Sequence, residues 1–126
     1  MGPFLVIGVR MGLVGLRELK LKENDGKLKV MIMTRPYTPF SCIIDGIQVT
    51  THCTIGNKKL KLKNSHKISA RFKAQNGKHV NISINSSKLE QLEKSLINSH
   101  ASEEVEKLAL NIASMPEKEL LTIERD

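Results

Sequence analysis

Hydrophobic residues in the first part of the chain recur first with helical and then with strand spacing. Residues 4–21 form a long, mostly apolar stretch, which predicts a helix. Residues 27–33 read KLKVMIM, and this alternation predicts a strand with Leu28, Val30 and Ile32 on one face. The chain therefore begins with a helix followed by a strand.

A loop bounded by prolines separates this strand from a second predicted helix. Pro36 and Pro39 enclose the loop, and Thr38 or Ser41 is placed to cap the helix that follows. That helix is expected to extend to about His52.

Strict alternation of apolar and polar residues predicts three short strands in the middle of the chain. They cover residues 58–63, 68–74 and about 80–84, and Asn76-Gly77 is typical of a two-residue hairpin between the last two. We expect an antiparallel meander with one apolar and one cationic face.

Helical spacing returns in the last third of the chain. Ser87 and Glu90 form a capping box for one helix, and Ser102 begins another. Residues 120–124 are compatible with a short helix or a strand. The order α-β-α-β-β-β, followed by C-terminal helices, predicts one α+β domain over residues 1–126.

Composition narrows the class of protein. Of the 126 residues, 40% are hydrophobic, enough for an ordinary core, and no apolar run is long enough to span a bilayer. Arg10 interrupts the apolar N-terminal stretch, so we interpret that stretch as a helix of the domain. Two cysteines without an export signal favour a cytoplasmic protein with free or metal-bound thiols over a disulfide scaffold.

Charge is distributed unevenly. Residues 57–79 carry eight Lys or Arg and no acid, whereas residues 87–126 are net negative. The basic strands could bind nucleic acid or an anionic coenzyme, but no aromatic residue interleaves with them for base stacking, so we do not expect nucleic acid. A solvated or helix-covered lysine face is the simplest interpretation. The cationic positions are Lys59, Lys61, Lys63, Arg71, Lys73 and Lys78.

Three glycines mark one side of the first helix. Gly8, Gly12 and Gly15 follow i, i+4, i+7 spacing. Each costs about 1 kcal/mol relative to alanine in a helix interior, so three on one face indicate that another backbone approaches closely. The neighbour is either another helix or a second protomer, and we expect a homodimer through this strip.

The second predicted helix carries most of the residues suited to chemistry. On a helical wheel Cys42, Asp45, Val49, His52 and Cys53 fall within roughly a 120° arc. Cys42 and Cys53 are roughly 16 Å apart along a continuous helix, too far to share a metal ion. The candidates therefore form two pairs, Cys42 with Asp45 and His52 with Cys53.

Each candidate also has a structural interpretation. Either cysteine could be a small buried hydrophobic residue, although the positive end of the helix dipole favours a thiolate at Cys42. His52 could cap the last carbonyls of the helix. Asp45 could orient Arg10 or Arg35 through a bidentate ion pair.

Two sequence blocks resemble a known family. GPFLVIGVRMGLVGLREL and SCIIDGIQVTTHCTIGN are similar to the FmdE (or FwdE) family, which is associated with formylmethanofuran dehydrogenase. The family pattern runs roughly H-G-H-L-x-P-x-L-x-x-G-x-R-M-G and then C-x-x-D-x-I-Q-x-x-T-G-C-T-x-G-K. The matching residues are Gly2, Pro3, Leu5, Gly8, Arg10, Met11, Gly12, Cys42, Asp45, Ile47, Gln48, Thr51, Cys53, Thr54 and Gly56.

The resemblance implies an α-β-α-β-β-β core with a mixed sheet, and an accessory or metal-binding role associated with one-carbon, methanogenic-type metabolism. It also implies a molybdenum or tungsten enzyme as partner, and zinc or another divalent transition metal as cofactor. The family's His-x-His pair would precede this chain, its glycine before the second cysteine is His52 here, and its C-terminal zinc ribbon has no counterpart. We therefore expect an N-terminally shortened member with an incomplete metal site and no stand-alone catalysis.

Overall fold

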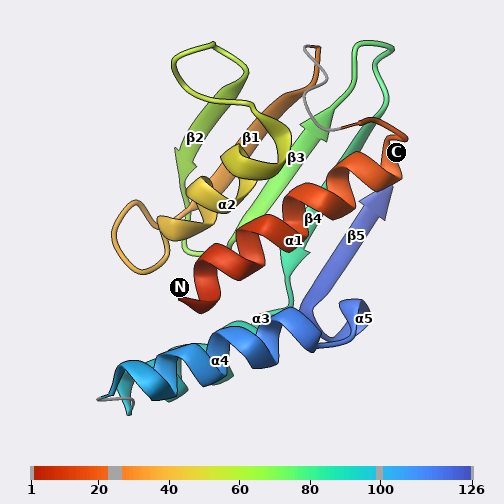
Figure 1. Ribbon diagram of the computed structural model, residues 1–126. Coiled ribbons are helices and arrows are strands. Elements are labelled where there is room, and N and C mark those ends of the chain that lie inside the picture. The colour runs from red at the N-terminus through yellow and green to blue at the C-terminus, as the bar shows by residue number, and fades with distance from the viewer. Residues whose placement is uncertain (1, 23–26, 99–100, 126) are drawn as a thin grey trace.

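The computed structural model describes residues 2–22, 27–98 and 101–125, which form an α+β domain (Figure 1). Its elements are α1 (Pro3–Glu18), β1 (Lys29–Thr34), α2 (Cys42–Thr51), β2 (Leu60–Asn64), β3 (Ser69–Lys73), β4 (His79–Ile84), α3 (Ser86–Ile97), α4 (Ser102–Ser114), α5 (Glu117–Leu120) and β5 (Leu121–Arg125). The predicted fold class and the order of the first six elements are confirmed. The segment after Pro116 forms both a short helix and a strand.

All five strands belong to one mixed sheet with the order β2-β1-β3-β4-β5. β1 pairs in parallel with β2 and antiparallel with β3, while β3 and β4 form the predicted hairpin, with Gly77 at φ 89°. The expected meander of three consecutive strands is therefore wrong at β2. The crossover through α2 returns the chain to the outer side of β1, and such a crossover joins parallel strands.

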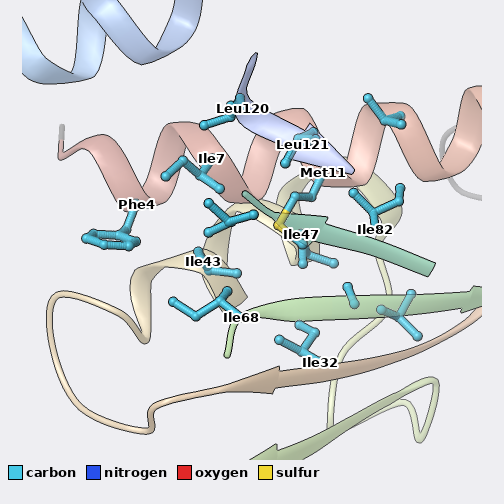
Figure 2. Close-up of a cluster of buried hydrophobic side chains, with 14 of the residues drawn as sticks. Phe4, Ile7, Met11, Ile32, Ile43, Ile47, Ile68, Ile82, Leu120 and Leu121 are labelled. Atoms are coloured by element: carbon cyan, nitrogen blue, oxygen red, sulfur yellow. The ribbon is translucent and has the colours of Figure 1, made fainter. Parts of the chain in front are cut away.

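Helices α1 and α2 cover one face of this sheet, and the core lies between the two layers (Figure 1). Figure 2 shows Ile7 and Met11 of α1 above Ile43 and Ile47 of α2, with Ile32 on the sheet below. All five side chains are fully buried. The alternation of β1, β3 and β4 thus fills one face with apolar side chains, as predicted.

The glycine strip of α1 is buried against elements of the same chain. A Cβ at Gly8 would lie 2.3 Å from the carbonyl oxygen of Ile43 in α2, and one at Gly12 would lie 1.8 Å from the Thr50 hydroxyl. A Cβ at Gly15 would meet the ring of Phe72 in β3 at 2.7 Å. The neighbour that needs these glycines is thus α2 with β3, so the strip expected as the dimer surface is not available to a second protomer.

The C-terminal helices pack at one end of this two-layer core, with α4 against α1. Arg10 of α1 joins them, because its Nη1 donates hydrogen bonds to the carbonyl oxygens of Ile112 (2.8 Å) and Met115 (2.5 Å). A cation among the last carbonyls of a helix is favoured by the helix dipole. Within the described ranges, no helix is long and apolar enough to cross a membrane.

Candidate functional site

The outer face of α2 carries four of the five residues expected on one arc. Cys42 is half-buried at the start of the helix, and Asp45 and His52 are exposed. Val49 is 66% exposed. An apolar side chain flanked by a carboxylate, an imidazole and a thiol gives this face the composition of a contact surface. We refer to Cys42, Asp45, Val49 and His52 together as the α2 outer face.

Cys53 does not share this face. His52 adopts a left-handed conformation with φ 61°, and its backbone N–H donates to the carbonyl of Gln48 at 2.8 Å, which ends the helix at Thr51. The chain turns inward, so that Cys53 is fully buried and its Sγ donates to the carbonyl of Leu28 at 3.2 Å. The arc predicted a helical Cys53, but the helix ends two residues earlier. His52 does cap the helix as one interpretation held, through its backbone.

The donors on α2 do not form a complete metal site. Across residues 2–22, 27–98 and 101–125, no three His, Cys, Asp or Glu side chains are grouped so that they could hold a metal ion. Cys42 and Asp45 are three residues apart on one helix and offer two donors, whereas zinc is almost always held by three or four protein ligands. A metal at this position would need ligands from another molecule.

The arginines expected beside Asp45 bind elsewhere. Arg10 caps α4, as described above, and Arg35 pairs with Glu93 of α3 at 3.1 Å. The proposed bidentate pairing of Asp45 with either arginine is therefore wrong. Asp45 lies on the solvent side of α2, where a carboxylate in the first turn is stabilised by the positive end of the helix dipole.

A second polar cluster surrounds Arg35, which is only 6% exposed. Its Nε donates to the carbonyl oxygen of His66 at 3.2 Å, and its guanidinium lies 4.4 Å from the centroid of the Phe40 ring. Together with the ion pair to Glu93, these contacts join the end of β1 to α3 and to the β2–β3 loop. No local pattern in the sequence predicts this cluster, since its members are far apart in the chain. Its charge is matched internally, so we assign it a structural role.

The sheet face opposite α1 and α2 is cationic and exposed. Lys61 and Lys63 of β2 share it with Arg71 and Lys73 of β3, as the alternation predicted. Because β1 lies between these strands, Lys29 joins the same face. The helix-covered alternative for these lysines is excluded, since all five side chains are exposed. Lys78 pairs with Ala74 at the hairpin end, which places it on the other side of the sheet.

The loop between α2 and β2 is held by Asn57. Its Oδ1 accepts hydrogen bonds from the backbone N–H groups of Thr54 (2.9 Å) and Lys59 (3.1 Å), and its Nδ2 donates to the carbonyl of His52 at 2.8 Å. Lys58 adopts φ 65° in this loop. A buttressed loop with a left-handed lysine has a defined shape, which fixes where Lys58 and Lys59 enter the basic face.

These features define a class: a small α+β domain with a mixed sheet, one face covered by a glycine-packed helix pair and the other face basic. A family model described as "FmdE, Molybdenum formylmethanofuran dehydrogenase operon" matches residues 1–122. The chain therefore belongs to the FmdE family.

Two individual proteins show how far the similarity extends. An FmdE-like protein of the tungsten formylmethanofuran dehydrogenase type, from Syntrophus aciditrophicus, superposes with a TM-score of 0.66 at 19% identity, over 98% of this chain and 62% of that one. A probable S-adenosyl-L-methionine-binding protein from Archaeoglobus fulgidus is 33% identical over 58 residues, which are 46% of this chain and 16% of that protein. The chain thus spans less than two thirds of either relative.

Proposed function

We propose that this chain is an FmdE-type accessory protein that acts by binding a partner and does not catalyse a reaction alone. The observation that supports this most directly is the α2 outer face, where Val49 is 66% exposed between Asp45 and His52. Exposed apolar side chains rimmed by polar ones are typical of contact surfaces.

The partner that we propose is a molybdenum or tungsten formylmethanofuran dehydrogenase. The family description and the name of the structural relative support this choice. The role would place the protein in one-carbon metabolism of methanogenic type, in the cytoplasm.

The proposed metal is zinc or another divalent transition ion shared between chains. Cys42 and Asp45 would supply two ligands from α2, and the partner would supply the others. The ion would contribute a structural link across the interface. Homodimerisation is a further part of the proposal, through a surface other than the buried glycine strip.

Association with the enzyme can be tested by sedimentation velocity with a purified tungsten formylmethanofuran dehydrogenase. Wild type is expected to co-sediment with it, and Val49→Glu is expected to abolish the complex because it places a charge at the centre of the contact. The matched control is Leu110→Glu, which alters a residue of α4 that is 70% exposed. Wild-type protein that sediments separately from the enzyme would refute the partner assignment.

Metal content of the complex tests the shared ion. We expect about one ion per chain in the purified complex, lost on Cys42→Ser and retained on Cys53→Ser. An unchanged metal content in the Cys42→Ser complex would exclude Cys42 as a ligand.

A further inference from the structure

The basic face of the sheet contains a hollow with an unusual lining. Its volume is about 370 Å³, and Met31 and the backbone of Val30 contribute its apolar part. Among the described residues, none that lines it is acidic. Its charged residues are Lys29, Lys58, Lys59, Lys61, Arg71 and Lys73.

The strand register brings these cations together. Lys29 is directly opposite Lys73, and Met31 is opposite both Arg71 and Lys61. Side chains at such paired positions lie about 5 Å apart, and like charges there are destabilising. On the other flank of Lys29, the carbonyl of Lys59 accepts a hydrogen bond from the N–H of Val30 at 2.8 Å. The fold therefore concentrates positive charge at a cost to its own stability.

The acidic residues that the structure describes on this sheet and in ion pairs do not neutralise the cluster. Glu124 is on the same face, but it pairs with Asn81 at the far edge of the sheet, where β5 lies two strands beyond β3. The ion pairs of Glu18, Glu93 and Glu117 are with arginines outside the hollow. A multiply charged anion would supply the counterpart.

We propose that this hollow binds an organic polyphosphate of the nucleoside triphosphate class. Its volume lies at the lower end of the range for small-molecule pockets, about 300–1,000 Å³. Lysine ammonium groups bind phosphate as point charges, and Arg71 adds a planar donor suited to two phosphate oxygens. Met31, which is 37% exposed, provides an apolar surface for the organic part of the ligand.

Charge and shape favour this ligand over a nucleic acid strand. Proteins that bind single strands stack bases on aromatic side chains, and the described residues that line the hollow include none. Phe72 is fully buried on the opposite face of β3. The Asn57-buttressed loop closes one side of the hollow with Lys58 and Lys59, which suits a compact ligand.

Calorimetric titration of the full chain at about 0.15 M salt, where long-range attraction between surface charges is screened, tests this proposal. ATP and inorganic tripolyphosphate are the probes. We expect dissociation constants of about 0.1 mM or tighter, weakened about tenfold or more by Lys73→Glu and by Arg71→Glu. Similar binding of the two probes would identify the phosphate chain as the recognised group, and tighter binding of ATP would add the nucleoside; each outcome supports the proposal.

Lys78→Glu is the matched control, because it makes the same charge change in the same hairpin outside the hollow. We expect it to change either affinity by less than about threefold, as for a distant screened charge. Without ligand, Lys73→Glu is expected to raise the melting temperature by about 1–4 °C, because it replaces a repulsive pair with Lys29 by an attractive one. A stable variant that no longer binds shows that the loss is local.

Three results would overturn the proposal. The first is wild-type protein that binds neither probe, including the case in which it retains only long RNA. The second is equal weakening by Lys78→Glu and Lys73→Glu. The third is a change in oligomeric state on Lys73→Glu, which would identify the face as a contact between copies of the chain.

Discussion

Gly46 of α2 lies directly against Gly8 of α1: a Cβ at position 46 would be 2.7 Å from the carbonyl carbon of Gly8. The same Cβ would lie 2.4 Å from the carbonyl oxygen of Leu5 and 2.5 Å from the backbone nitrogen of Val9. These are all backbone atoms, which cannot rotate away. The two helices that cover the sheet are therefore in contact through their main chains.

Gly46→Ala is predicted to force α1 and α2 apart and to lower the free energy of unfolding by about 3 kcal/mol. Gly56→Ala is the control, since its Cβ would meet nothing nearer than the Thr54 hydroxyl at 3.8 Å. We expect that variant to unfold within about 0.5 kcal/mol of wild type. Urea denaturation followed by circular dichroism measures both. Equal midpoints for the two variants would contradict the close approach of the helices.

Acid is predicted to weaken the link between α1 and the C-terminal segment. Arg17 donates to both carboxylate oxygens of Glu117, at 2.6 and 3.0 Å, and this contact holds the pKa of Glu117 below its ordinary value. Hydrogen bonds from Arg125 and Arg17 likewise lower the pKa of Glu18. A depressed carboxylate pKa stabilises the folded state above the unfolded value, and this stability is lost as the pH falls through the folded pKa.

Thermal unfolding between about pH 6 and pH 3 measures this effect, since free glutamate titrates near 4.3. We expect the melting temperature of wild type to fall below about pH 4.5, and Glu117→Gln to reduce the slope. Glu106→Gln, on the exposed side of α4, is expected to retain the wild-type slope. If Glu117→Gln also retained it, the ion pair would contribute nothing to stability in solution.

Arg35→Ala is predicted to destabilise the protein by about 2–4 kcal/mol. It removes the ion pair to Glu93, the donor to the His66 carbonyl and the contact with the Phe40 ring at once. Arg35→Lys retains the charge but loses the planar stacking, so an intermediate loss is expected. Arg71→Ala serves as the control because Arg71 is exposed on the sheet. Chemical denaturation that ranked Arg71→Ala with Arg35→Ala would refute the structural role of the cluster.

The two thiols are predicted to differ in reactivity. Cys42 is half-buried, whereas Cys53 is fully enclosed and donates to the carbonyl of Leu28. A disulfide exchange reagent should therefore label one thiol of the native protein rapidly and the second only after denaturation. Cys42→Ser should lose the rapid phase and Cys53→Ser should keep it. Rapid labelling of both thiols in wild type would show that Cys53 is accessible.

Local spacing determined most of the elements of this protein. The alternation of 68–74 and 80–84 with Asn76-Gly77 between them was sufficient to predict the β3–β4 hairpin, because both strands and their turn lie within a few residues of each other. The spacing of Gly8, Gly12 and Gly15 likewise established that a backbone approaches α1 closely. The motif pair around Arg10 and Asp45 indicated the family that the comparison over residues 1–122 identified.

Tertiary structure decided which segments use these features. The partner of the glycine strip proved to be α2 and β3, and β1 entered the sheet between β2 and β3, since pairing between distant strands depends on the crossover path. One left-handed residue, His52, moved Cys53 from an exposed arc into the core. The alternation of β1 by itself placed Lys29 on the face opposite Leu28, but only the register placed it beside Lys73. Periodicity specifies which face of its own element a residue occupies, whereas long-range packing specifies what that face contacts.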